Sequence, residues 1–289
     1  MQKIQKRKHH YVPRFYLNQF LDSRVQPPRE PYLWVFDKQE EGDVFKRAPK
    51  NIGYETGFYD MKLIDGTTTT HVEDFFHKVI ETPSSKILRK ILDQQPITDE
   101  EKQKFAMFIF YSHARVPNYI NFMNKFYEAT KEGKSNEKQV IKDPEVEKMI
   151  KEAEIKDEVS TLEFMIELVK VFAPIIYNMN WQFLFAPNGY AFITSDNPVI
   201  LNDPKQTTIY RPVVGWNNPN IQLTFPLSPS MCFLGTWTKK RNLYKVADIR
   251  FVRAVNFRTA FFATRYLFGS RPFYLKEEVL KLEALKSIK

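Results

Sequence analysis

The sequence contains little glycine, little cysteine and no long apolar run, and each shortage excludes a class of protein. Only 9 of its 289 residues are glycine, which argues against a glycine-rich nucleotide loop and a many-turned all-β protein. The single cysteine, Cys232, excludes an internal disulfide and is typical of a reducing compartment. No stretch has the ~18 apolar residues of a membrane helix, and the first residues are polar, unlike a signal peptide. We therefore expect a cytoplasmic protein with no membrane partner.

Aromatic residues and positive charge are abundant instead. The chain has 25 Phe and 14 Tyr and is 43% hydrophobic, so we expect a large core dominated by aromatic packing. The formal net charge of +9 suits an anionic partner such as nucleic acid or another phosphate-bearing ligand. Lysine-rich proteins of AT-rich bacterial genomes reach a similar charge without such a partner, so charge alone leaves both interpretations open.

Apolar periodicity divides the chain into helical and β-rich parts. The spacing predicts a short β pair at 32–36 and 44–47, then a helical sub-region over 71–180 and a β-rich sub-region over 181–289. Helices that are grouped apart from strands indicate an α+β fold rather than alternating α/β. We expect 1–289 to form one domain, with a central helical block and a mainly antiparallel sheet formed by the N-terminal strands and the 181–237 strands.

Local signals mark several elements within these parts. Thr98 with Glu101 is a capping box, and Thr82-Pro83 reads as an N-cap followed by the first helical position. The segments on either side of Pro187-Asn188-Gly189 predict a β-hairpin. Strands are then expected at 208–214, 221–225 and 231–237, and helices at 71–80, 246–266 and 276–288.

The most informative stretch is HHYVPRFYLNQF, from His9 to Phe20. Pro13 suits the first position of a helix, where its missing N–H is not needed. Leu17 and Phe20 recur at helical spacing from Pro13, so we expect one face of this helix to pack inward.

The two histidines of this stretch precede the expected first helical turn. Unpaired N–H groups and the helix dipole attract anions there. A phosphate held by Arg14, with His9 and His10 beside it, is therefore one interpretation. The other is that His10 only bonds a backbone carbonyl and that the preceding lysines are solvated.

A second candidate site is Ser195-Asp196-Asn197-Pro198, at the end of an apolar strand. Asp, Asn and Pro commonly end strands because of ordinary turn chemistry. Asp196 could equally be a general base or metal ligand, with Asn197 beside it to contact substrate. Ser195 lacks the G-x-S-x-G context of a nucleophilic serine.

Arg115 lies late in an apolar helix, where a buried guanidinium needs a carboxylate or phosphate partner. Glu73 is the natural internal partner, and a structural ion pair and anion binding remain open alternatives. His71, His77 and His113 lack a zinc-helix spacing.

The pattern His-x-Val-Pro-x-x-Tyr-Leu-x-x-Phe at 10–20 resembles the opening of the bacterial and fungal family called domain of unknown function 4238. Val72-Glu73, ARVP at 114–117, FITSDNPV at 192–199 and FPLSP at 225–229 are similar to later motifs of that family, in the same order. The resemblance implies that these segments belong to one fold. It implies no activity, because the family carries none that is established.

Two hypotheses from different classes follow. In the first, the chain is a phosphodiester hydrolase, a nuclease of bacterial defence or toxin type, in which His10 is the general acid or base. Glu73 and Asp196 would activate water or hold a divalent metal, the one cofactor we consider. The phosphate would be bound by His9, Arg14, Arg115 and Asn197. In the second, the chain binds nucleic acid or a protein without catalysis, through its basic start and the aromatic loop 53–59. A structural subunit is the third alternative.

Overall fold

The structure is a computed structural model of the chain. It describes residues 8–40, 43–56, 61–62, 68–69, 76–117, 119–120, 161–205, 215–216, 218–239 and 242–286. The predictions for Glu73, His71 and the strand at 208–214 lie outside these residues, as do residues 57–59 of the aromatic loop.

Two sheets contain most of the described strands. The first has the order β12-β7-β11-β10-β9 and the second the order β3-β2-β13-β8. Neighbouring strands are antiparallel in both sheets, except that β12 runs parallel to β7. The bounds of the first sheet are β12 (Tyr244–Val246), β7 (Asn180–Phe185), β11 (Met231–Thr236), β10 (Gln222–Ser228) and β9 (Ile200–Asn202). Those of the second are β3 (Phe45–Arg47), β2 (Leu33–Asp37), β13 (Tyr266–Gly269) and β8 (Thr194–Ser195).

The α+β class is confirmed, but the strands do not form one joint sheet. The N-terminal strands β2 and β3 pair with β13 and β8, whereas most strands of 181–237 form the other sheet. The sequence cannot show this division because β13, which joins β2 to β8, lies more than 200 residues beyond β2. Two smaller pairs complete the strands: β1 (Lys8–His10) with β4 (Tyr54–Thr56), and β5 (Met61–Lys62) with β6 (Thr68–Thr69).

The predicted hairpin around Pro187 is wrong, although the turn itself is present. The Tyr190 amide donates to the Pro187 carbonyl at 3.0 Å. β7 nevertheless pairs with β11 and β12, while β8 joins the second sheet. The connecting segment lies along the β10–β11 turn, because Ala186 and Phe192 amides donate to the carbonyls of Ser230 and Pro229. The central residues of β7 are buried on both faces, so it belongs in the middle of a covered sheet rather than in an isolated hairpin.

Of the two helix N-termini predicted at Thr98 and Thr82, the structure confirms only the first. The capping box at Thr98 is confirmed, since its hydroxyl accepts from the Glu101 amide and the Glu101 carboxylate accepts from the Thr98 amide. Thr82 is not a cap: a π-helix, Phe76–Glu81, runs directly into the following α-helix, and the Thr82 hydroxyl donates to the His77 carbonyl. The α-helices are α1 (Arg14–Leu17), α3 (Thr82–Leu92), α4 (Asp99–Ala114), α7 (Thr161–Asn178), α8 (Ile249–Phe262) and α9 (Pro272–Lys286). Short 3₁₀ turns cover Asn18–Phe20 and Pro49–Asn51.

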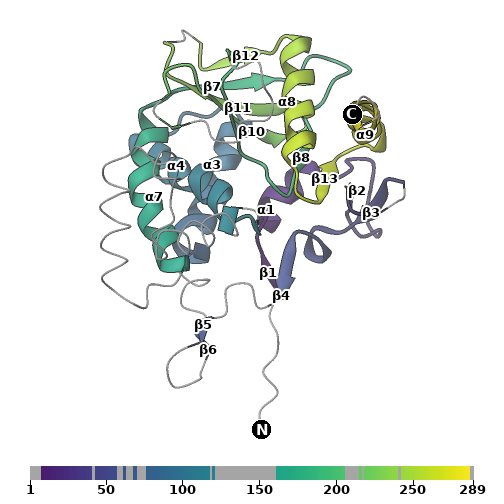
Figure 1. The fold of residues 1–289 in the computed structure, drawn as a ribbon, viewed down its shortest axis with the longest axis horizontal. Coiled ribbons are helices and arrows are strands. Elements are labelled where there is room, and N and C mark those ends of the chain that lie inside the picture. Colours follow the sequence, from purple (N-terminus) through teal and green to yellow (C-terminus); the bar gives the residue numbers. More distant parts are fainter. Residues whose placement is uncertain are drawn as a thin grey trace.

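Helices cover both faces of the five-stranded sheet (Figure 1). Side chains alternate across a strand, so Phe183 and Leu184 of β7 point to opposite faces. Phe183 packs in the cluster that contains α4 and α7, whereas Leu184 packs with Val252 and Val255 of α8. The sheet therefore lies between α8 on one side and the helical block on the other.

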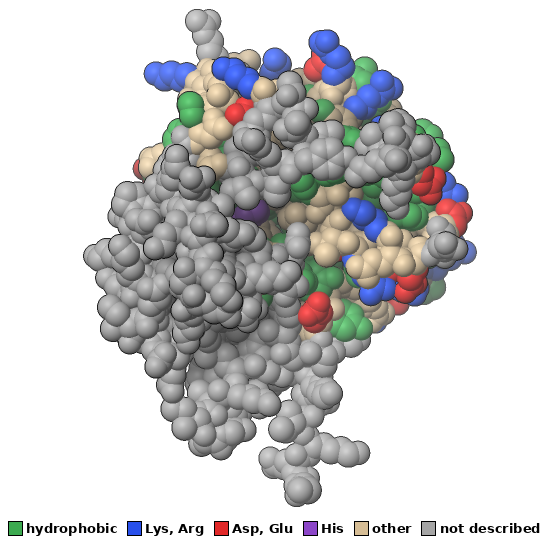
Figure 2. Space-filling model, viewed as in Figure 1, with side chains coloured by type: hydrophobic (Ala, Val, Ile, Leu, Met, Phe, Trp, Pro, Cys, Tyr) green, Lys and Arg blue, Asp and Glu red, His purple; other side chains and the backbone are tan. Residues whose placement is uncertain are grey.

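Charged side chains of both signs are spread over the face shown in Figure 2, where the residues are described. Lys and Arg side chains lie among Asp, Glu and hydrophobic side chains, without a continuous basic patch in the described part of this face. Within the described helices, none combines the length and the apolar character that crossing a bilayer requires.

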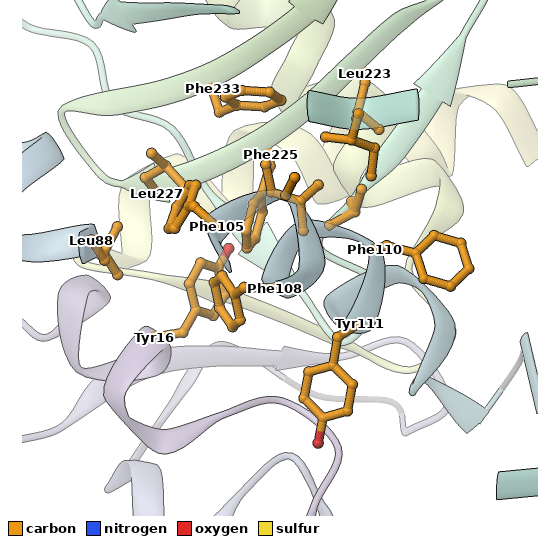
Figure 3. Close-up of a cluster of buried hydrophobic side chains, with 14 of the residues drawn as sticks. Tyr16, Leu88, Phe105, Phe108, Phe110, Tyr111, Leu223, Phe225, Leu227 and Phe233 are labelled. Carbon is orange, nitrogen blue, oxygen red and sulfur yellow. The ribbon is translucent and has the colours of Figure 1, made fainter. Parts of the chain in front are cut away.

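The main core is aromatic, as the composition predicts. Phe225 of β10 points from the sheet towards α1 and α4 (Figure 3). Its ring lies 5.0 Å from the ring of Tyr16 and 5.8 Å from that of Phe108, measured between centroids. Phe105 adds a further ring 5.6 Å from Phe108. The N-terminal segment is thus part of the central core.

Candidate functional site

The histidine pair lies in a strand rather than in a loop before a helix. His10 faces Tyr54 in the β1–β4 register, and Pro13 is the N-cap of α1 rather than its first residue. α1 has only 4 residues and continues as a 3₁₀ turn, so it does not provide the predicted helix N-terminal anion site. The inward face is confirmed, because Leu17 and Phe20 are fully buried.

The glycine before β4 allows this arrangement. Gly53 has φ +68°, which favours glycine, and its carbonyl accepts from the Val12 amide at 3.2 Å. A Cβ on Gly53 would lie 3.3 Å from the Cβ of Val12. This close approach holds the chain next to His10 against the start of α1.

His10 carries a neutral imidazole at pH 7. Burial, followed by the positive charges of Arg14 and Arg115, lowers its pKa from 6.5 to about 4. The Pro49 backbone and the Glu81 carboxylate act in the opposite direction and are weaker. The Nε2 atom is buried and has no hydrogen-bond partner among the described residues. The ring is therefore a neutral group with one nitrogen uncommitted.

Arg115 is the buried cation beside His10, and among the described acidic residues it pairs with Glu81. The side chain is 3% exposed, and its Nη1 donates to Glu81 Oε1 at 2.5 Å. Its Nη2 donates to the backbone carbonyl of His10, and its guanidinium lies 4.3 Å from the centre of the Tyr111 ring. A structural ion pair was one of the two predicted roles, with Glu73 as the acid. The acid found here, Glu81, ends the π-helix.

Two further residues near His10 and Glu81, Arg14 and His77, are more exposed. Arg14 is a solvent-exposed residue of α1. The His77 side chain is 69% exposed, with its Nδ1 3.7 Å from Glu81 Oε2. We call His10, Arg14, His77, Glu81 and Arg115 the His10 cluster. It joins β1, α1, α4 and the π-helix, a rare element that is frequent at functional sites.

His9 does not share the setting of His10. His9 is only 1% exposed. It precedes His10 in β1, so the two side chains point to opposite faces of the strand. A buried side chain on the other face gives no support to the predicted contact with substrate.

Asp196 organises the backbone instead of facing an open site. The residue is 2% exposed, and its two carboxylate oxygens accept from the amides of Thr264, Arg265 and Tyr266 at 2.6–2.9 Å. Burial raises the pKa of Asp196, and these amides partly oppose the rise. The Asn197 side-chain amide donates to the Phe262 carbonyl at 3.2 Å. These contacts support the turn-forming interpretation of both residues and give none to metal binding or substrate contact.

The other titratable candidates are core residues. His113 has its Nδ1 3.3 Å from the Val199 carbonyl, and burial lowers its pKa to about 4. Burial raises the pKa of the Cys232 thiol to about 12, so it is not an activated nucleophile. No group of three or more His, Cys, Asp and Glu side chains that could hold a metal occurs in the described part of the chain.

Glu81 was missed from the sequence, although one signal pointed to it. His77 and Glu81 are four residues apart, so a helical turn would bring them together. The contact with Arg115, 34 residues further on, has no local signal.

Comparison with known proteins gives a family and no activity. Neither a search of curated proteins nor a search of solved structures found a match. A family model matches residues 8–272, which include His10, Arg115 and Asp196. The chain therefore belongs to the family described as protein of unknown function (DUF4238).

Proposed function

We propose that the protein is a phosphodiester hydrolase in which His10 acts as the general base. The observation that carries the proposal is the His10 imidazole, which is neutral and lies within the field of two arginines. Its buried Nε2 has no hydrogen-bond partner among the described residues. A neutral imidazole accepts a proton, and nearby guanidinium groups stabilise a phosphate anion. The site is thus narrowed from the predicted composite to the His10 cluster, with Asp196 left in its structural role.

The charges of the cluster suggest how substrate would activate the base. A pKa of about 4 makes free His10 a weak base at neutral pH. A bound phosphodiester would offset the positive charges of Arg14 and Arg115, which contribute to this low value. The pKa of His10 would then rise towards the working pH.

The proposed reaction is hydrolysis of a phosphodiester bond, with one proton taken from water and one given to the leaving oxygen. Water attacks phosphorus while His10 accepts one of its protons, and the bond from phosphorus to the leaving oxygen breaks. The leaving oxygen then takes a proton from solvent or from protonated His10. Arg14, which is exposed, would bind a non-bridging oxygen. Arg115 is engaged with Glu81 and with the His10 carbonyl, so its role would be to position His10.

The test is the hydrolysis of bis(4-nitrophenyl) phosphate and of labelled single- and double-stranded oligonucleotides by the full chain. For H10A we expect a loss in kcat of about 10²–10⁴-fold, the usual contribution of a general base. R14A should mainly raise KM. R250A is the matched control, because Arg250 is an exposed arginine on α8 and its loss should leave both constants unchanged. No turnover by the wild type, or full turnover by H10A, would overturn the proposal.

Oligonucleotide binding measured in parallel separates the hydrolase from the non-catalytic alternative. Fluorescence anisotropy at several salt concentrations gives the affinity and the number of phosphates contacted. Tight, salt-dependent binding by a wild type that releases no product would favour a nucleic-acid-binding protein and count against hydrolysis.

A further inference from the structure

A second arginine of interest is Arg258 on α8, whose guanidinium is buried along one edge. Its Nε and Nη2 atoms are buried, and neither has a hydrogen-bond partner among the residues that the structure describes. The residue as a whole is only partly buried, so the group lies just beneath the surface. Burial lowers the pKa of Arg258, but a guanidinium remains charged at any ordinary pH.

The edge formed by Nε and Nη2 is one that arginine uses to bind an oxyanion. The N–H groups of Nε and Nη2 point the same way and fit the two oxygens of a carboxylate or phosphate side-on. Arg24 uses both atoms on the carboxylate of Asp22, at 3.0 and 2.7 Å. Arg265 directs the same two atoms to Asp37 and Glu40, at 2.8 and 2.9 Å.

Among the described residues, no acidic side chain fills this role for Arg258. Within the described chain, the one titratable group that interacts electrostatically with it is Cys232 of β11. Burial raises the pKa of that thiol to about 12, so the thiol is neutral and leaves the charge uncompensated. A buried cation without a partner is costly, and binding an anion would remove this cost.

Other unused polar atoms lie on α8 or are bonded to it. Thr259, the next residue, is fully buried, and its hydroxyl has no hydrogen-bond partner in the described residues. The same holds for Oδ1 of Asn197, whose amide group donates to the Phe262 carbonyl, about one turn beyond Arg258. Buried polar groups in folded proteins are nearly always satisfied, so such a concentration points to an absent ligand.

We propose that Arg258 is the receptor for the carboxylate or phosphate group of a small anionic ligand, held side-on by its Nε and Nη2. The site lies on the α8 side of the five-stranded sheet, on a different element from each member of the His10 cluster. It does not depend on hydrolysis at His10, and the two proposals can fail separately.

The experiment measures Tm of the full chain with sodium phosphate, sodium succinate or sodium chloride at matched ionic strength. We expect phosphate or succinate to raise Tm by about 5 °C over chloride when present at ~100 times its Kd. The ion that acts identifies the ligand group as phosphate or carboxylate. In R258M, which keeps an apolar stem, this rise should vanish.

Two further variants keep the test decisive. R253M is the matched control: Arg253 is an exposed arginine on the same helix, and its loss should preserve the response. H10A should preserve it too, which separates this site from the proposed active site. In chloride alone, R258M should melt at or above the wild-type Tm, because it removes an unpaired buried charge.

Direct observation of the edge completes the test. The Nε–H resonance of Arg258, assigned by its absence from R258M, should shift on addition of the anion that raises Tm. An unchanged resonance and equal Tm responses of wild type and R258M would overturn the proposal. A lower Tm of R258M in chloride would also count against it, since it would mean that the charge is already paired. A rise in Tm of the same size in wild type and R258M would identify an adventitious ion only.

Discussion

Asp196 and Tyr266, 70 residues apart, are hydrogen-bonded in both directions. The Asp196 amide donates to the Tyr266 carbonyl at 3.0 Å, and the Tyr266 amide donates to Asp196 Oδ2 at 2.9 Å. With the amides of Thr264 and Arg265 on the same carboxylate, this aspartate holds the start of β13 beside the end of β8. A residue that resembles a catalytic acid in the sequence thus joins two strands of the second sheet.

The substitution D196N tests this role. An amide has one acceptor oxygen in place of two, and it places an N–H₂ group against backbone N–H donors. We expect a loss of about 2–4 kcal/mol in the free energy of unfolding, measured by urea denaturation. D248N is the control, since Asn caps a helix as well as Asp does and Asp248 is the N-cap of α8. Equal stability of the two variants would contradict a structural role for Asp196.

Breaking the pair of Arg115 and Glu81 should destabilise the fold strongly. R115A leaves the Glu81 carboxylate and the His10 carbonyl without their donor. We expect a cost of about 3–5 kcal/mol, as is usual when one partner of a buried pair is removed. A double-mutant cycle with E81Q in urea should show that the effects are not additive. Additive effects would mean that the two side chains do not interact in solution.

Acid should destabilise the protein through its buried histidines. Since the folded-state pKa values of His10 and His113 are about 4 and the ordinary value is 6.5, the unfolded chain binds protons first as the pH falls. Stability is therefore complete above pH 6.5 and declines towards pH 4, with a slope of up to ~1.4 kcal/mol per pH unit for each histidine. H113F should remove the contribution of His113 to the pH dependence of the free energy of unfolding, measured by urea denaturation between pH 5 and 6.5. Y16F, which changes no group that titrates there, should keep the wild-type slope.

The hydroxyl of Tyr16 should contribute to stability despite its apolar surroundings. It donates to the Pro226 carbonyl at 2.6 Å and therefore accepts from the Thr194 hydroxyl at 2.5 Å. Y16F leaves two buried groups without a partner, and we expect a cost of about 1–3 kcal/mol by thermal or urea unfolding. The double variant Y16F/T194V should recover part of this loss, because it removes one of the orphaned groups. A further loss in the double variant would contradict this account.

Local chemistry explains which elements the sequence predicted correctly. The capping box of Thr98 and Glu101 spans three residues, so its geometry is contained in the segment itself. Thr82-Pro83 carried an equally clear local signal, but the π-helix before it continues into α3 and replaces the predicted start. The hairpin around Pro187 failed for a related reason. Its turn forms, yet the choice of partner strands depends on which faces are buried.

The sequence predicted some residues of the candidate site but not the contacts that join them. His10, Arg14 and Arg115 do come together, and all three were chosen because of the residues next to them in the sequence. Glu81 was not found, because its contact with Arg115 bridges two helical segments. Arg258 carried no signal either, since an unused guanidinium edge is visible only once every neighbour is in place.

The sequence by itself determined the α+β class, the aromatic core, the inward face of the N-terminal segment and, through motifs in a fixed order, the family. These follow from composition and from periodicities of a few residues, which local backbone geometry enforces. Only the tertiary structure decided that Asp196 bonds to the backbone and that Glu81 pairs with Arg115. It also decided that Nε and Nη2 of Arg258 have no hydrogen-bond partner among the described residues. A buried polar group is separated from water and needs a hydrogen-bond partner within the protein. Whether it has one depends on packing between segments far apart in the chain.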